Sequence, residues 1–126
     1  MMLQKFCLLA GTALGALTVM IGAFGAHALA AKLAETNRTA TFETAVKYQM
    51  YHTLALLLLG ILMFWVQHSA FNVAAVCFVA GILVFSGSLY ILSLTGITWL
   101  GAITPIGGLL MIVGWASMFY GLLRTL

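Results

Sequence analysis

Charged residues are scarce in this chain. Its 126 residues include five Lys and Arg and two Asp and Glu, so charged residues make up 6% of the sequence and hydrophobic residues 64%. A soluble domain contains about 25% charged residues, which it needs to cover its surface. The composition therefore excludes a soluble globular domain and predicts that lipid covers most of the molecule.

Motifs that carry enzyme chemistry are also missing from the sequence. Cys7 and Cys77 stand alone in apolar runs, and each is expected to be a small buried residue rather than part of a disulfide or a metal site. There is no Gly-rich phosphate loop, no HExxH motif and no pair of carboxylates, and no basic stripe suited to nucleic acid. We expect no enzyme, no catalytic residue, no metal or cofactor and no nucleic-acid partner.

Four apolar runs are long enough to cross a bilayer. A hydrocarbon core about 30 Å thick requires roughly 20 helical residues per crossing. The expected fold is an all-α, polytopic four-helix transmembrane bundle, a single domain over residues 1–126. Its helices are expected at about residues 6–29, 45–66, 71–92 and 105–123.

The first run has two interpretations. Lys5 followed by apolar residues and an Ala-His-Ala sequence at 26–28 resembles a signal peptide. However, the run has about 20 residues, longer than the usual 7–15 of a signal peptide. Its glycines also fall on one face of a helix, as expected for a helix that packs against another. We therefore expect that the first helix is retained and not cleaved.

Glycines form stripes on the first and fourth runs. Small residues let helix backbones approach closely in lipid, where burying apolar surface gives no gain. These stripes predict packing within one chain, or a homo-oligomer if one small-residue face is left over. The predicted packing residues are Gly11, Gly15, Gly22, Gly25, Gly107, Gly114 and Gly121.

Polar residues gather near one end of the expected helices. Consecutive spans run in opposite directions, so the ends of the first and third spans share a leaflet with the starts of the second and fourth. The other leaflet is expected to be almost free of polar side chains. The residues of this candidate polar pocket are His27, Tyr48, Gln49, His52, Ser86, Ser88, Tyr90 and Thr104.

Three interpretations of this polar set are open. In the favoured one the groups satisfy each other and fix the register of the helices, as buried polar groups usually do. In the second, they form a pocket for a quinone, a lipid headgroup or a haem. In the third, they move ions or protons, because histidine titrates near neutral pH. The expected spans contain no carboxylate and no broken helix, which disfavours transport.

Local sequence features suggest four further details. Thr104 before Pro105 is typical of an N-cap followed by proline at the first helical position. Trp115 falls in the middle of the fourth run, where its indole N–H is expected to donate to a neighbouring helix. Residues 30–44 are polar and are expected to form a short surface helix. Three Lys and Arg near the first loop, against two on the opposite side, favour a cytoplasmic first loop and periplasmic termini.

Four sequence blocks resemble those of a known family. "GAFGAHAL" (22–29), "YQMYHTLALL" (48–57), "FSGSLYIL" (85–92) and "TPIGGLLMIVGW" (104–115) are similar to the blocks of the YgdD/YwdK-like family of small inner-membrane proteins (UPF0382, domain of unknown function 423). The resemblance covers essentially the whole chain. It implies four helices, a retained first helix, a bacterial inner (plasma) membrane location and no assigned biochemical role.

Two functions follow as expectations. The first is a non-enzymatic membrane component that affects envelope integrity through helix packing, with itself or with a protein partner. The alternative is a binder or transporter of a small lipophilic molecule, which would use the polar pocket in one leaflet.

Overall fold

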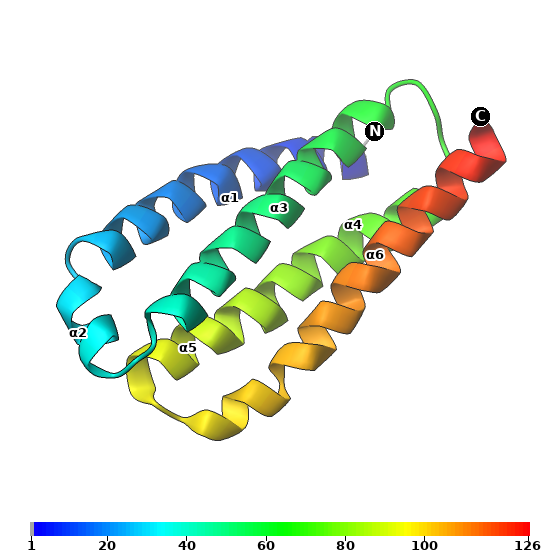
Figure 1. Cartoon of the computed structure of the whole chain (residues 1–126). Helices are drawn as coiled ribbons and strands as arrows, with labels where there is room; N and C mark the ends of the chain where they lie inside the picture. The colour runs from blue at the N-terminus through cyan, green and yellow to red at the C-terminus, as the bar shows by residue number, and fades with distance from the viewer. Residues whose placement is uncertain (1) are drawn as a thin grey trace.

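All four apolar runs are helical in the computed structural model, which describes residues 2–126 (Figure 1). The third span is interrupted by a π-helical turn, and a 3₁₀ turn leads into the fourth. The elements in chain order are α1 (Met2–Ala26), α2 (Ala30–Glu35), α3 (Thr39–Leu62), α4 (Ser69–Gly81), η1 (Ile82–Ser86), α5 (Gly87–Thr95), η2 (Thr98–Ala102) and α6 (Thr104–Thr125). The all-α prediction is confirmed, since the described residues contain no strand.

The four spans are apolar and long enough to cross a bilayer, with mean hydropathy between 1.3 and 2.3. Their bounds differ from the expected ones where polar residues are helical. α3 begins at Thr39 rather than near residue 45, because its first turns are polar but still hydrogen-bonded as a helix. α1 ends at Ala26, and residues 27–29 form a turn. The apolar runs show which residues lie in the membrane core, whereas a helix can extend beyond the core into polar residues.

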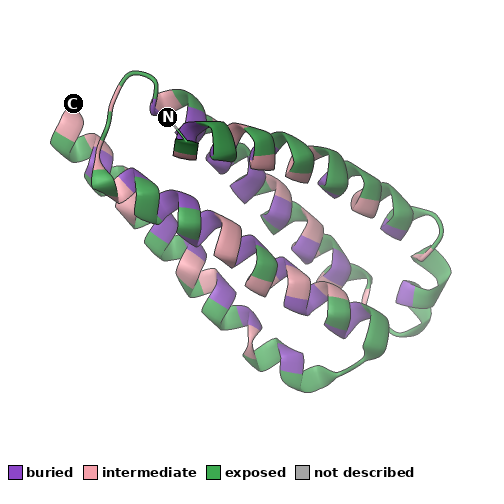
Figure 2. Cartoon of the chain, turned by 180° about the vertical axis from the view of Figure 1, so that it is seen from behind, coloured by how far each residue is buried: buried purple, intermediate pink, exposed green. Residues whose placement is uncertain are grey.

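The spans pack in the order in which they occur in the chain. α1 lies on α3, α3 lies on the third span, and the third span lies on α6 (Figure 1). The two middle spans are therefore more buried than the two outer ones, and buried residues lie mostly where helices face one another (Figure 2). Residue 2 and the C-terminus lie at the same end of the bundle, opposite α2 and η2 (Figure 1).

The glycine stripe of α1 packs on α3. A Cβ added at Gly11 would lie 2.6 Å from the side chain of Leu57, and one added at Gly25 would lie 2.2 Å from the ring of Phe42. Gly22 and Gly15 are less tightly packed, since their Cβ atoms would lie 3.3 Å and 3.8 Å from the nearest α3 side chains.

The glycine stripe of α6 packs on the third span. The closest approach is at Gly107, where an added Cβ would lie 2.3 Å from the backbone nitrogen of Phe85, inside the π-helical turn. Gly114 and Gly121 face the rings of Phe78 and Phe71 at 2.7 Å and 2.5 Å. Both stripes are thus used within one chain, and a homo-oligomer would need a different surface.

A cluster of buried apolar residues lies toward the end of the bundle that holds the termini. It includes Leu56, Leu59, Phe71 and Phe78, all at 0% exposure, together with Cys7. Both cysteines are buried and free, as the sequence suggested.

The surface helix expected over residues 30–44 is shorter: α2 covers Ala30–Glu35, and residues 39–44 form the start of α3. Leu33 of α2 and Phe42 of α3 are both buried inside the protein. α2 therefore folds back onto α3 and closes the end of the bundle opposite the termini.

Candidate functional site

His52 lies near the middle of α3 and is buried, with 5% of its surface exposed. Its Nδ1 lies 2.7 Å from the main-chain oxygen of Tyr48, and its Nε2 lies 3.0 Å from the indole nitrogen of Trp115. An indole N–H can only donate, so Nε2 must accept and the imidazole proton must sit on Nδ1. His52 is therefore a neutral imidazole with both nitrogens engaged by the protein.

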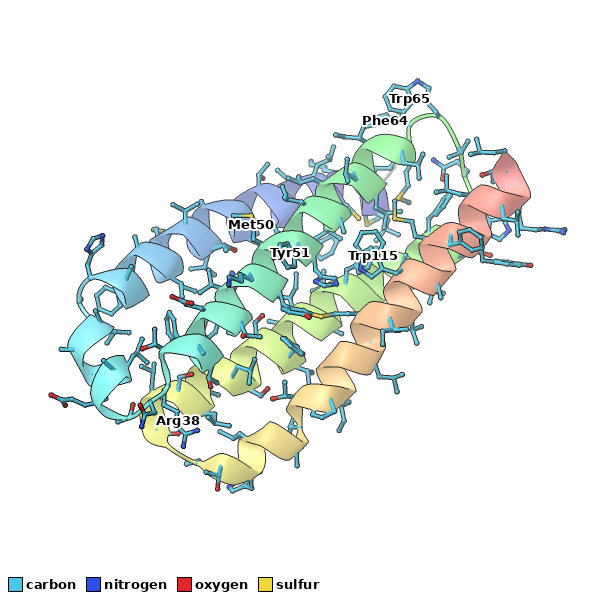
Figure 3. The ribbon with its side chains drawn as sticks, viewed as in Figure 1. Arg38, Met50, Tyr51, Phe64, Trp65 and Trp115 are labelled. Carbon is cyan, nitrogen blue, oxygen red and sulfur yellow. The ribbon has the colours of Figure 1, made fainter. Side chains whose placement is uncertain are left out.

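Trp115 is the partner that reaches His52 from α6. Figure 3 shows this side chain extending from α6 toward α3. The ring of Phe78, on α4, lies beneath both, with its centroid 5.8 Å from that of His52 and 5.2 Å from that of Trp115. Three spans meet at this point, and the prediction that Trp115 donates to a neighbouring helix is confirmed.

Gln49 and Tyr90 form the next contact toward the α2 end of the bundle. The Tyr90 hydroxyl, on α5, donates to the Gln49 Oε1 atom at 2.6 Å. The Tyr90 ring also packs against Phe42, with centroids 5.2 Å apart. Since Gln49 is buried, this bond satisfies the side-chain oxygen of an amide that is largely removed from solvent.

Two serines of the third span bond to its neighbours on either side. The Ser86 hydroxyl donates to the main-chain oxygen of Ala45 on α3 at 2.7 Å. The Ser88 hydroxyl lies 2.7 Å from that of Thr104 on α6. Ser86 is the last residue of the π-helical turn, which packs against both α3 and α6.

The expectation that Thr104 caps α6 is wrong. Thr104 is the first residue of α6 rather than its N-cap, and its side chain contacts Ser88 and the main-chain oxygen of Leu100. The reason is the 3₁₀ turn η2, which precedes α6 and supplies local bonds such as Ile103 N–H to Leu100 O at 3.0 Å. A helix that continues from a 3₁₀ turn has less need of a side-chain cap.

Two of the eight expected residues do not contribute side-chain hydrogen bonds. His27 lies beyond the end of α1 and is exposed, because α1 stops one residue before it. Tyr48 is 40% exposed and contributes its main-chain oxygen and its ring, which packs on Phe85 with centroids 4.7 Å apart. The other six form what we call the polar seam: Gln49, His52, Ser86, Ser88, Tyr90 and Thr104, with Trp115 as a seventh member.

The seam lies in the half of the bundle that holds α2 and η2. Thr104 begins α6, whereas His52 lies about 20 Å along α3 from Thr39, at roughly 1.5 Å per residue. The seam thus reaches from one end of the bundle to its middle.

The opposite half was expected to be almost free of polar side chains, and Gln4 is a buried polar residue that this expectation did not name. Gln4 is buried there, and its amide donates to the main-chain oxygen of Met63, the C-cap of α3. Such terminal carbonyls have no partner inside their own helix. Gln4 was missed because nothing in an isolated first turn of α1 shows that it faces the end of another helix.

The seam offers little to a ligand. Of the eight expected residues, only Tyr90 lines one of three cavities formed by residues 2–126. That cavity, of about 420 Å³, is walled by apolar residues such as Met20 and Phe24. Within residues 2–126, no group of three or more His, Cys, Asp or Glu is arranged to hold a metal ion.

These features define a multi-pass membrane protein whose buried polar side chains bond to one another and to main-chain oxygens of the bundle. The chain belongs to the family described as "Protein of unknown function (DUF423)", whose model matches residues 21–108.

Bacterial relatives match most of the chain. A UPF0382 membrane protein of Staphylococcus aureus is 50% identical over 109 residues, which cover 83% of this chain and 88% of the relative. The UPF0382 membrane protein YwdK of Bacillus subtilis is 38% identical over 98% of this chain and 100% of its own length. The UPF0382 inner membrane protein YgdD of Escherichia coli is 35% identical over 98% of this chain and 93% of its own length.

The comparison with solved structures gives no match. The relatives and the four spans together make this chain a multi-pass protein of the bacterial inner membrane.

Proposed function

We propose that this protein is a non-enzymatic component of the inner membrane that supports envelope integrity by packing against itself or a partner membrane protein. The observation that carries the proposal is the state of His52. A histidine that binds a ligand or moves a proton needs a free nitrogen, and both nitrogens of His52 already have protein partners.

The polar seam fits a structural role because its bonds join different spans. Interhelical hydrogen bonds in membrane proteins contribute about 0.6 kcal/mol each on average, with a maximum near 1.7. Four such bonds connect α3, the third span and α6 into one unit. They are His52 with Trp115, Gln49 with Tyr90, Ser86 with Ala45 O, and Ser88 with Thr104.

The first span is attached differently. α1 is held to α3 by glycine packing and by the Gln4 bond to Met63, and none of the seam bonds reaches it. The result is a three-span unit of fixed register with α1 at its side. Such a unit presents a preformed surface to another membrane protein, which lowers the entropy lost on association.

Binding of a lipophilic molecule in the seam has less support. Tyr90 lines an apolar groove, but its hydroxyl is already engaged by Gln49. A ligand at the seam would have to break interhelical bonds that hold the spans together.

The proposal is tested by complementing a strain that lacks the gene. Wild type, His52→Ala and the control Leu58→Ala are expressed, Leu58 being 58% exposed on the outer face of α3. Entry of a membrane-impermeant dye and protein abundance are measured together. We expect the deletion to raise dye entry, Leu58→Ala to restore the wild-type level, and His52→Ala to restore it in proportion to its abundance.

Two results would contradict the proposal. If dye entry in the deletion strain equals that in the wild-type strain, the proposed role in envelope integrity is wrong. Loss of complementation by His52→Ala at full abundance and unchanged thermal stability would show that His52 acts chemically rather than structurally.

A further inference from the structure

A groove of about 710 Å³ lies where α1 ends, α2 crosses and α3 begins. Its walls on the side of α1 and α2 consist of small residues such as Gly22, Ala26 and Ala34. α3 contributes Thr39, Phe42, Glu43, Val46 and Lys47 to the same groove. It is thus a concave site with a carboxylate and an ammonium group on a wall that is otherwise mostly apolar.

Glu43 and Lys47 share one face of α3 on the wall of this groove. They are four residues apart, one helical turn, and both are exposed. Their charged atoms do not lie within the 4.0 Å of a direct ion pair. Each side chain is therefore available to a ligand in the groove.

The two charges lie at different depths. Gly25 of α1 faces Phe42 and Gly22 faces Val46, so Glu43 is level with the end of α1 and Lys47 lies deeper along the span. The difference is about 6 Å, at roughly 1.5 Å per residue. An ammonium group at the depth of Lys47 is stabilised when an anion accompanies it.

We propose that this groove binds the headgroup of a zwitterionic phospholipid with a primary ammonium, of the phosphatidylethanolamine class. In such a lipid the phosphate lies nearer the acyl chains and the ammonium lies further out. Lys47, the deeper group, meets the phosphate, and Glu43, the outer group, accepts hydrogen bonds from the ammonium. The depths and the signs of the two charges match this headgroup in its natural orientation.

The same geometry discriminates among headgroups. Phosphatidylcholine carries a trimethylammonium that has no N–H to donate to Glu43. Phosphatidylglycerol has no cation, so Glu43 would face an anionic lipid without compensation. A second copy of this chain is a less suitable occupant, because both charges line a concavity walled by α1 and α2 of the same chain. This inference does not depend on the proposed packing function.

Native mass spectrometry of the full chain in mild detergent tests the proposal. The protein is titrated with phosphatidylethanolamine, phosphatidylcholine and phosphatidylglycerol of matched acyl chains. We expect one tightly held phosphatidylethanolamine per chain, with about tenfold weaker binding of phosphatidylcholine, equivalent to about 1.4 kcal/mol. Lys47→Gln and Glu43→Gln are each expected to reduce this binding about tenfold.

Controls separate the site from general charge effects and from unfolding. Lys32→Gln removes an equal charge from the exposed surface of α2 outside the groove, and we expect unchanged binding. Glu43→Gln is also expected to improve binding of phosphatidylglycerol relative to phosphatidylethanolamine, an effect that loss of folding cannot produce. Thermal unfolding of each variant verifies the fold.

Three outcomes would overturn the proposal. Equal retention of the three lipids would indicate annular lipid only. Retention that Lys47→Gln leaves unchanged would place the lipid elsewhere. A dimer that binds no lipid and dissociates in Glu43→Gln or Lys47→Gln would assign the two charges to contact with a second copy.

Discussion

The indole N–H of Trp115 donates to Nε2 of His52 at 3.0 Å, and this bond joins α6 to α3 across the ring of Phe78. The backbones of α3 and α6 make little direct contact, since each packs mainly on other spans. The side-chain bond therefore supplies a connection that backbone packing does not.

A double-mutant cycle measures this connection. We expect Trp115→Phe to lower the free energy of unfolding in detergent by about 1 kcal/mol, because it leaves a buried nitrogen of His52 without a partner. In the His52→Ala background the same substitution should have little effect, giving a coupling of about 0.6–1.7 kcal/mol. Trp99→Phe is the control, since Trp99 is exposed. Additive effects of the two substitutions would show that the bond is not made.

A second prediction concerns the close approach of α6 to the π-helical turn. Gly107→Ala should destabilise the protein by about 1–3 kcal/mol or more, because its Cβ would lie 2.3 Å from the Phe85 backbone nitrogen, which cannot move aside as a side chain can. Gly108→Ala is the matched control, since its Cβ would make ordinary contact at 3.8 Å. Thermal unfolding of both variants gives the comparison. Equal stabilities would mean that the two backbones are further apart than described.

A third prediction concerns the bond between Tyr90 and Gln49. Tyr90→Phe should reduce the free energy of unfolding by about 1 kcal/mol, because the buried Gln49 oxygen loses its only side-chain donor among the described residues. Tyr51→Phe removes a hydroxyl from a 54% exposed tyrosine and should change stability less. A larger effect of Tyr51→Phe would indicate that the outer face of α3 carries the more important hydroxyl.

The helices and much of the packing could be predicted from the sequence. Long apolar runs specify spans because hydrocarbon leaves backbone groups no partner outside a helix. The glycine stripes of α1 and α6 identified the packing faces because only small residues admit contacts such as that of Gly107 with Phe85. The sequence also predicted that Trp115 donates a hydrogen bond to another helix, since an indole N–H in mid-span needs an acceptor. It did not identify His52 as that acceptor.

Other features could not be predicted because they depend on where a helix ends. One turn of difference at the end of α1 places His27 outside the protein, although its residue type suggested a buried site. The 3₁₀ turn before α6 changes the role of Thr104, and Ser86 lies at the end of a π-helical turn that the sequence did not predict. Gln4 acquires its role only from the position of Met63, which is 59 residues away in sequence.

A fourth prediction concerns orientation. The excess of Lys and Arg near the first loop predicts a cytoplasmic first loop and periplasmic ends. Alkaline phosphatase fused after Leu126 should be active, and a fluorescent protein that folds only in the cytoplasm should remain dark there. The same reporters inserted at Thr36 should give the reverse pattern. Cytoplasmic fluorescence from the fusion at Leu126 would invert the assignment.

The most direct test of the polar seam is the proton position on His52. Long-range ¹H–¹⁵N correlation spectra of histidine-labelled protein distinguish the two neutral tautomers from each other and from imidazolium. His68 provides an internal contrast, because its Nδ1 accepts from the Ala70 N–H at 3.0 Å, which places its proton on Nε2. His27→Gln and His68→Gln assign the signals.

We predict that His52 is neutral near pH 7 with its proton on Nδ1, that Trp115→Phe perturbs its Nε2 signal, and that His68 shows the opposite tautomer. A His52 imidazolium, or an exchanging mixture of tautomers unaffected by Trp115→Phe, would mean that its nitrogens are open to a ligand and would contradict the structural account of the seam.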